Sequence, residues 1–359
     1  MRPVLPVRLL RAKAAVAAVA AALLLLGMPS AHAQASGPPK MTDGFGLTQV
    51  GAATGTATNF VITVTTPEVT GEHHIRILLP GDYATNPSKR YPVFYFLHGA
   101  SDDPVNPNLA YPALTAAKSM ITVIPDGGLR GWYTNWLDQE TVVGAQNWEN
   151  FHINQVIPFI DANLRTIAAK KGRAVAGLSM GGFGSMHYAQ AHPELFSQVG
   201  SFSGAVDLSI DHAVMRAAVV ATLTNIGAAL CGSSNPTCSL DFGPTVSSDA
   251  IFGTPYPVLN LDWRWNEADP SSHMDRLAGM GISLYTGDGA GDPANPEFWV
   301  RSASQHAKDH LDALGYPYHY VDYGNGAGWG SCDGGHDYAC WAQDLVDFVP
   351  RMEAAFASA

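Results

Sequence analysis

The segment GLSMG, residues 177–181, places a serine between two glycines where a strand-like run meets a helix-like run. A nucleophilic serine needs a tight, strained turn that exposes its oxygen, and side chains at the flanking positions would collide there. The N-terminus of the following helix adds a positive dipole end beside a developing oxyanion. The pattern therefore predicts that Ser179 is the nucleophile of an acyl-transfer reaction.

A serine hydroxyl needs a base, and the base needs an acid that orients it. In α/β-hydrolases these residues follow one another along the chain as serine, acid, histidine. Among 13 histidines, His336 lies in the loop beyond the last predicted strand, where this order requires the base. The loop after the preceding strand offers Asp288, Asp292 and Glu297 as the acid. Their spacing does not choose among them.

An oxyanion hole needs two backbone N–H groups. Met180, directly after the nucleophile, is expected to supply one, and the loop after a strand in the first half of the chain supplies the other. The segment FLHGAS, residues 96–101, nominates Ala100 for the second. We expect His98 to shape this loop rather than to act as the base.

Strand-like and helix-like segments alternate along most of the chain. Short, nearly all-apolar runs predict strands that are buried on both faces, and 3.6-residue periodicity predicts the helices. The predicted strands are 91–99, 120–128, 173–178, 198–204, 282–289 and 318–324, preceded by an antiparallel pair at 59–69 and 72–80. The predicted helices are 148–164, which Pro158 is expected to bend, a helix directly after Ser179, 296–314 and 338–356.

This alternation indicates an α/β protein with a central, mostly parallel sheet flanked by helices. No linker rich in Pro, Gly or Ser divides the chain, so residues 34–359 are expected to form a single domain. The stretch 207–280 is too long for a simple crossover between parallel strands. It predicts a helical cap insertion.

The first 33 residues have the pattern of a secretory signal peptide. Four basic residues (Arg2, Arg8, Arg11 and Lys13) precede an apolar run at 14–27, and Ala31-His32-Ala33 fits a cleavage site. The run is shorter than the roughly 20 residues that span a bilayer. We therefore expect that residues 1–33 are removed and that the protein is secreted or extracellular, with the cell envelope as a possible destination. We expect no stable membrane insertion after cleavage.

Charge excludes some partners. The chain has 20 Lys and Arg against 31 Asp and Glu, and four of the basic residues lie in the leader, so the mature chain would have a net charge of −15. No basic patch follows, which makes nucleic acid a poor partner. We expect a small-molecule or lipid ester as substrate, and no cofactor.

Four cysteines in an exported chain are expected to form disulfides. They fall into two close couples, which predicts the pairs Cys231–Cys238 and Cys332–Cys340. A zinc site at Cys332, His336 and Cys340 is the alternative. Zinc takes three or four ligands, and no second cysteine pair lies nearby in the sequence, so we expect no metal here.

The chain resembles the esterase D-like α/β-hydrolases. Within them it is most similar to the secreted mycolyltransferases (diacylglycerol acyltransferases) of the mycobacterial cell envelope and to their actinobacterial esterase relatives. The resemblance runs from about Tyr91 to the C-terminal helix and rests on FLHGASDD, IPDGG, WYTNW with NWENF, GLSMGGFGSMHYAQAHPELF, FGTPYPVLNLDWRWNEADP and GGHDYACW. It implies an α/β-hydrolase fold, Ser179 and His336 in catalysis, and oxyanion amides at Met180 and Ala100. It also implies Glu297 as the acid, ahead of Asp292 and Asp288.

Departures from the mycolyltransferases bear on the substrate. Where they have Asp and Arg beside the oxyanion loop for the sugar acceptor, this chain has His98 and Ser101, and Tyr338 replaces a Trp after the histidine. A secreted serine carboxylesterase is therefore the leading hypothesis. The alternatives are an acyltransferase that moves the acyl group to an alcohol, and a non-catalytic envelope-binding protein on the same fold.

Overall fold

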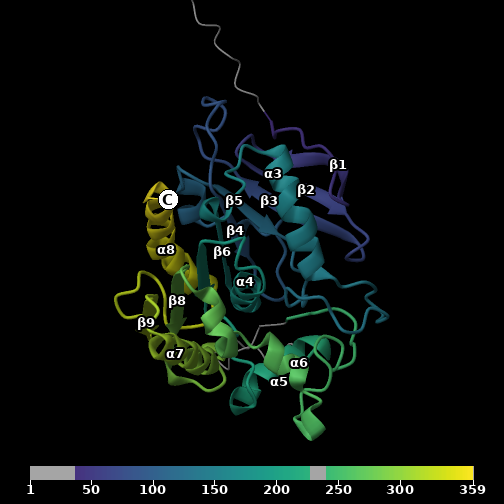
Figure 1. Cartoon of the computed structure of the whole chain (residues 1–359), viewed down its shortest axis with the longest axis vertical. Coiled ribbons are helices and arrows are strands. Elements are labelled where there is room, and N and C mark those ends of the chain that lie inside the picture. Colours follow the sequence, from purple (N-terminus) through teal and green to yellow (C-terminus); the bar gives the residue numbers. More distant parts are fainter. Residues whose placement is uncertain (1–36, 227–239, 359) are drawn as a thin grey trace, which may run out of the picture. The chain divides into compact units, whose positions relative to one another are not determined.

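A computed structural model describes residues 37–226 and 240–358. Within these residues, nine strands form one sheet in the order β1-β2-β3-β5-β4-β6-β7-β8-β9 (Figure 1). The strands are β1 (Thr48–Gly55), β2 (Asn59–Thr65), β3 (Glu72–Leu78), β4 (Val93–Leu97), β5 (Ile121–Pro125), β6 (Arg173–Leu178), β7 (Gln198–Phe202), β8 (Gly281–Gly287) and β9 (His319–Gly324).

The sheet is antiparallel at one end and parallel elsewhere. β1, β2, β3 and β5 pair antiparallel, and every pair from β5 through β4 to β9 is parallel. Every residue of β4, β5 and β6 is buried, as their apolar runs predict. The antiparallel pair β2–β3 is confirmed. The edge strand β1 was not predicted, because most of its residues are exposed and polar or small, and they show no apolar alternation.

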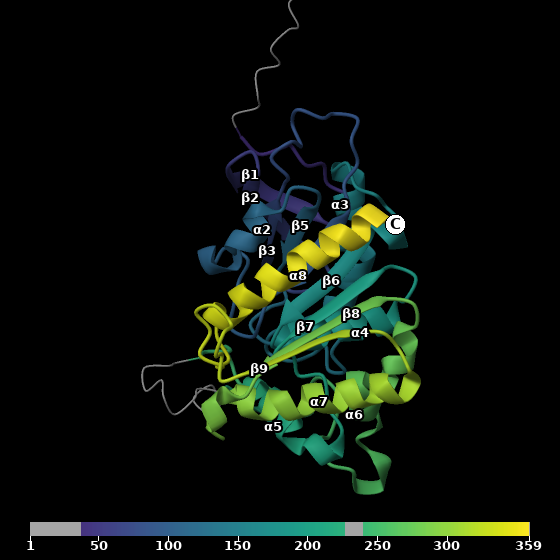
Figure 2. The ribbon, with the colours of Figure 1, turned by 90° about the vertical axis from the view of Figure 1, so that its left-hand side faces the viewer.

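Helices cover both faces of the sheet. They are α2 (Pro112–Ala116), α3 (Ile157–Asn163), α4 (Met180–Ala191), α5 (Ala213–Leu223), α6 (Trp263–Ala268), α7 (Pro296–Leu314) and α8 (Tyr338–Ser358). Strand β4 divides the core, because successive side chains of a strand point to opposite faces. Phe94 and Phe96 share a cluster with residues of α2 and α8, whereas Tyr95 and Leu97 share one with residues of α3 and α4. Figure 2 shows α8 crossing one face of the sheet. The predicted fold class is confirmed.

The segment predicted as one helix over 148–164 has two parts. Asn150–Val156 is π-helical, and α3 follows with Pro158 in its first turn. The N–H of Ile157 donates to the carbonyl of His152, five residues earlier. Proline has no N–H for the next α-helical bond, so a wide turn before it costs less than it would elsewhere. The predicted helix is therefore present, but its first half has π-helical rather than α-helical hydrogen bonds.

The chain between β7 and β8 contains α5 and α6 with short 3₁₀ segments at Val258–Asn260 and Pro270–Leu277. The predicted pair Cys231–Cys238 lies outside the described residues. Among the residues that are described, no helix combines the length and apolar character needed to cross a membrane.

Candidate active site

Ser179 lies on a strained turn between β6 and α4. Its backbone has φ 54° and ψ −118°, a conformation that non-glycine residues rarely adopt. The flanking glycines permit this turn. A Cβ on Gly177 would lie 2.4 Å from the carbonyl oxygen of Gly181, and a Cβ on Gly181 would lie 2.2 Å from that of Leu97. A side chain at either position would force the turn or the end of β4 to shift.

Ser179, His336 and Glu297 form one hydrogen-bonded chain. His336 Nε2 lies 2.8 Å from Ser179 Oγ, and His336 Nδ1 lies 2.8 Å from Glu297 Oε2. The two other acids proposed from the sequence have different contacts. Asp288 accepts a hydrogen bond from the N–H of Ala290, and Asp292 accepts one from that of Ala294.

The Glu297 carboxylate is completely buried at the first turn of α7. Its Oε1 accepts hydrogen bonds from Ser203 Oγ at 2.9 Å, from Thr286 Oγ1 at 3.0 Å and from the N–H of Gly287 at 2.7 Å. A buried charge is stable only when such donors compensate for lost water. Sequence reasoning missed Ser203, which directly follows β7, and Thr286, which lies one residue before the end of β8.

A disulfide closes the loop that holds His336. Cys332 and Cys340 are bonded, on either side of the histidine. The N–H of Gly334 lies 3.2 Å from Cys332 Sγ, and the Trp341 ring meets the imidazole edge to face at 5.0 Å. Since both sulfurs are in the disulfide, neither offers a thiolate to a metal.

The loop after β4 borders the serine. Gly99 and Ala100 line the same cavity as Ser179 and Met180. His98 is fully buried. Its Nδ1 lies 2.8 Å from the carbonyl oxygen of Gly99, and its Nε2 accepts a hydrogen bond from the N–H of Gly127 at 2.8 Å. This pairing makes Nδ1 the protonated nitrogen. His98 therefore holds the loop in place by bridging two backbone segments.

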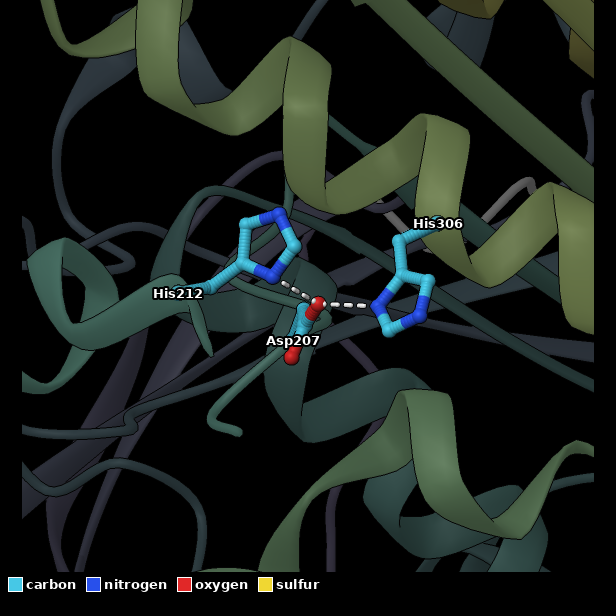
Figure 3. Close-up of side chains that lie close together, drawn as sticks. All are labelled: Asp207, His212 and His306. Atoms are coloured by element: carbon cyan, nitrogen blue, oxygen red, sulfur yellow. Dashed lines mark hydrogen bonds and ion pairs between the residues drawn. The ribbon is translucent and has the colours of Figure 1, made fainter. Parts of the chain in front are cut away.

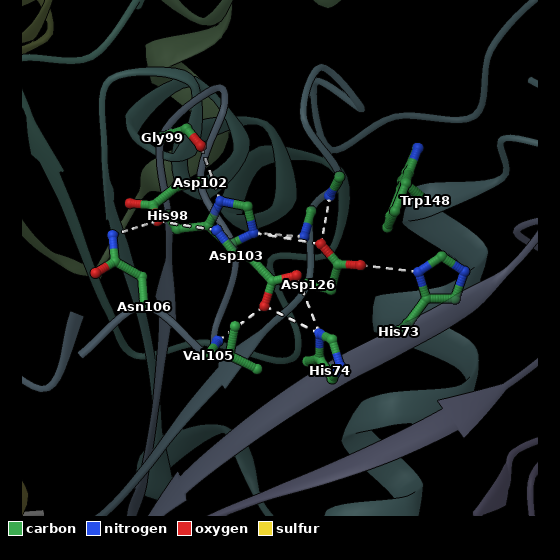
Figure 4. Close-up of polar contacts among 12 residues, drawn as sticks. His73, His74, His98, Gly99, Asp102, Asp103, Val105, Asn106, Asp126 and Trp148 are labelled. Atoms are coloured by element: carbon green, nitrogen blue, oxygen red, sulfur yellow. Dashed lines mark hydrogen bonds and ion pairs between the residues drawn. The ribbon is translucent and has the colours of Figure 1, made fainter. Parts of the chain in front are cut away.

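Behind this loop, acidic side chains meet histidines of β3 (Figure 4). Asp126 Oδ2 lies 2.8 Å from His73 Nδ1, and Asp103 lies 3.0 Å from His74 Nδ1. Burial by itself would raise the pKa of Asp126, but the hydrogen bond from His73 and the nearby imidazole of His98 hold that pKa below its usual value. These contacts tie the loop to the antiparallel part of the sheet.

A cavity of about 600 Å³ opens at Ser179. Its walls are largely apolar and come from the loop after β5, α5 and its flanking segments, and α7. The apolar lining residues include Trp132, Met215, Leu240, Phe242, Trp299 and Val300.

One rim of the cavity is polar. Tyr338 Oη donates to Asp102 Oδ2 at 2.7 Å, and Asn106 Nδ2 donates to Asp102 Oδ1 at 2.8 Å. Sequence reasoning singled out Tyr338 but not its partner Asp102, which lies 236 residues away in the chain.

The fold and the arrangement at Ser179 define an α/β-hydrolase. More narrowly, the chain belongs to the esterase family, since the family model described as "Putative esterase" matches residues 66–352. The relatives that the chain matches include esterases and an acyltransferase.

Individual relatives agree with this family. The chain is 33% identical to Esterase Rv1288 of Mycobacterium tuberculosis over 290 residues, covering 77% of this chain and 57% of that protein. It is 23% identical to the diacylglycerol acyltransferase/mycolyltransferase Ag85B of Mycobacterium avium over 279 residues, covering 73% of this chain and 74% of that protein. The crystal structure of M. tuberculosis MPT51 matches with a TM-score of 0.60 at 22% identity, covering 82% of this chain and 97% of that one. The chain thus spans little more than half the length of Esterase Rv1288.

Proposed function

We propose that this protein is a serine carboxylesterase that works through an acyl-enzyme intermediate. Ser179 Oγ donates its proton to His336 Nε2 and attacks the ester carbonyl. The amides of Met180 and Ala100 stabilise the oxyanion, and Glu297 orients His336 and stabilises its cation. His336 then protonates the leaving alcohol.

Deacylation reverses these roles for water. His336 takes a proton from a water molecule, which attacks the acyl carbonyl, and then returns the proton to Ser179 Oγ as the acid leaves. Apart from this water molecule, the groups that the proposed cycle uses belong to the protein. The substrate is a small-molecule or lipid ester whose acyl part fits the apolar cavity beside Ser179.

One observation carries the proposal: the continuous hydrogen-bonded chain from Ser179 Oγ through His336 to a buried, fully compensated Glu297. Replacing Ser179 by Ala tests it on short p-nitrophenyl esters. We expect kcat to fall by about 10⁶-fold, with only the residual catalysis of the oxyanion hole and substrate binding left. Labelling by a fluorophosphonate should be lost in the same variant. Unchanged hydrolysis would refute the assignment, and an unlabelled wild-type serine would favour a non-catalytic envelope-binding protein.

Acyl transfer to an alcohol is the second candidate. It is supported by the similarity to Ag85B and by the polar rim at Asp102 and Tyr338, which offers hydrogen-bonding groups to an acceptor. Measuring products with a polyol acceptor in excess separates the two activities. Transfer requires an acyl-polyol product that depends on Ser179, and release of free acid alone would reject it.

Export from the cytoplasm completes the proposal. The Cys332–Cys340 disulfide supports it, since disulfides persist mainly in oxidising compartments. Mass determination of the N-terminus of the protein recovered outside the producing cells tests whether residues 1–33 are removed.

A further inference from the structure

Three side chains of types that bind metals lie together outside the cavity at Ser179. Asp207 lies in the chain after β7, His212 directly precedes α5, and His306 lies in the middle of α7. Their ligand atoms all lie within 4.8 Å of one another. Figure 3 shows both imidazole rings turned toward the same carboxylate oxygen of Asp207. The cluster joins α5 to α7, the two helices whose residues wall the cavity.

The distances are unusual for a simple hydrogen-bonded cluster. Asp207 Oδ2 lies 2.6 Å from His212 Nδ1 and 2.5 Å from His306 Nδ1. Although His212 Nδ1 lies so close to Asp207 Oδ2, it makes no aligned hydrogen bond within the described residues. Two electron-rich atoms at this separation repel each other unless a proton or a metal cation lies between them. His212 Nδ1 therefore faces Asp207 Oδ2 without an aligned hydrogen bond, and a cation between the two atoms would remove their repulsion.

The other nitrogen of the same ring is already occupied. His212 Nε2 lies 3.0 Å from Ser302 Oγ, a hydroxyl of α7. Metal-binding histidines ordinarily donate their second N–H to such an acceptor, which fixes the tautomer and orients the ring. Ser302 would thus leave the lone pair of His212 Nδ1 free to point at Asp207 and His306.

Burial and exposure also suit a cation site. The Asp207 side chain is completely buried, whereas those of His212 and His306 are 19% and 35% exposed. Asp207 Oδ1 is held by the N–H of Ser209 at 2.9 Å, which leaves Oδ2 directed at the histidines. The partly exposed rings leave room for entry from solvent and for a water molecule as a fourth ligand.

We propose that Asp207, His212 and His306 bind a divalent transition-metal cation, with Zn²⁺ as the best match. Two imidazoles, one carboxylate and a water molecule make a common zinc set, whereas Ca²⁺ and Mg²⁺ prefer oxygen ligands. The three atoms must separate to about 3.4 Å to surround zinc in a tetrahedron. The site is independent of the proposed esterase activity. Its role is to hold α5 against α7 at the wall of the cavity.

The test uses the full chain without a histidine tag, stripped with EDTA and dialysed against ZnCl₂, CaCl₂ or MgCl₂. We expect one zinc per chain by mass spectrometry and no retained calcium or magnesium. At a zinc concentration 100 times the Kd, linkage predicts a rise in Tm of about 5 °C. The wild-type chain must show both effects. No retained zinc, or an unchanged Tm, would overturn the proposal.

Variants identify the ligands. His306→Ala removes a partly exposed ring, so the chain should fold, and we expect zinc affinity to fall at least about tenfold with loss of the Tm rise. His319→Ala is the matched control, because His319 also meets a carboxylate, Asp347, at 2.8 Å but without a second imidazole at that oxygen. Its zinc binding should equal that of the wild type. Equal zinc binding by the His306 variant, or equal loss in the His319 variant, would place the ion elsewhere and refute the site.

Discussion

Replacing Glu297 by Gln tests the acid of the proposed catalytic chain. Glutamine has nearly the same shape, and its carbonyl oxygen can still accept from Ser203, Thr286 and the N–H of Gly287. Its amide nitrogen would then face His336 Nδ1 in place of Glu297 Oε2. Two N–H donors cannot share that contact, so the imidazole must move its proton to Nε2. His336 could then no longer accept the proton of Ser179.

The structure sets the size of this effect. Glu297 Oε2 lies 2.8 Å from His336 Nδ1, so the centres of the two charges are roughly 4 Å apart once His336 is protonated. At an effective dielectric constant of about 20, that attraction is worth about 4 kcal/mol. With 1.36 kcal/mol for each factor of ten in rate, kcat/KM should fall about 10³-fold.

The assay is hydrolysis of p-nitrophenyl acetate and butyrate at constant pH, with circular dichroism and Tm to show that the variant folds. Asp288→Asn and Asp292→Asn are the controls, because both acids were candidates and asparagine can still accept from Ala290 or Ala294. We expect both controls to keep kcat/KM within about threefold of the wild type, since their hydrogen bonds at Ala290 and Ala294 lie outside the chain that joins Ser179 to Glu297. A folded Glu297 variant with more than a tenth of wild-type activity would refute the reasoning. So would an equal loss in the Asp292 variant.

Two further predictions concern stability. Replacing Cys332 and Cys340 by Ser should lower the free energy of unfolding by about 2–3 kcal/mol, and it should lower kcat because His336 lies on the closed loop. Thermal unfolding and ester hydrolysis measure these two effects. A double variant that is unchanged in both would show that other contacts hold the loop. Burial lowers the pKa of His152 from 6.5 to about 4. The unfolded chain therefore binds a proton below pH 6.5 that the folded chain refuses until about pH 4, so stability falls as pH falls between these values, by about 2 kcal/mol at pH 5. The variant His152→Gln keeps a donor for the Asp126 carbonyl and an acceptor for Tyr188. Its Tm should depend less steeply on pH between 7 and 5 than that of the wild type. Parallel curves of Tm against pH would contradict the assignment of this pH dependence to His152.

The metal proposal departs from the expectation drawn from the sequence. The sequence offered Cys332, His336 and Cys340 as possible ligands, and in the structure the two cysteines are bonded to each other. Asp207 and His306 are 99 residues apart, so no local spacing connects them. The proposed metal site at Asp207 and the proposed active site at Ser179 also differ in the expected effect of EDTA. Removing zinc should lower Tm without removing the groups that the proposed hydrolysis uses.

The sequence by itself determined the class of fold and nominated Ser179 as the nucleophile. Buried parallel strands are apolar throughout and helices have a 3.6-residue period, and both patterns are local. The Gly-x-Ser-x-Gly motif at Ser179 is also a local pattern, although the contacts that exclude side chains at its glycines include the end of β4. The place of His336 followed from chain order. The strand β1 and the π-helical turn at Asn150–Val156 escaped prediction because an exposed edge strand has no apolar alternation and a π-turn has no distinct period.

Spacing along the chain did not decide which acid meets His336; the family resemblance favoured Glu297, and the tertiary structure places that residue against the imidazole. Asp288, Asp292 and Glu297 lie within ten residues of one another, and any of them suits the chain order. Glu297 alone of the three hydrogen-bonds to the imidazole, with a donor from Ser203, 94 residues away in the chain. The same holds for the contact of Tyr338 with Asp102 and for the cluster at Asp207. Each depends on side chains from separate elements that meet at the edge of the sheet. The periodicity of one segment carries no information about the distance between its side chains and those of another element.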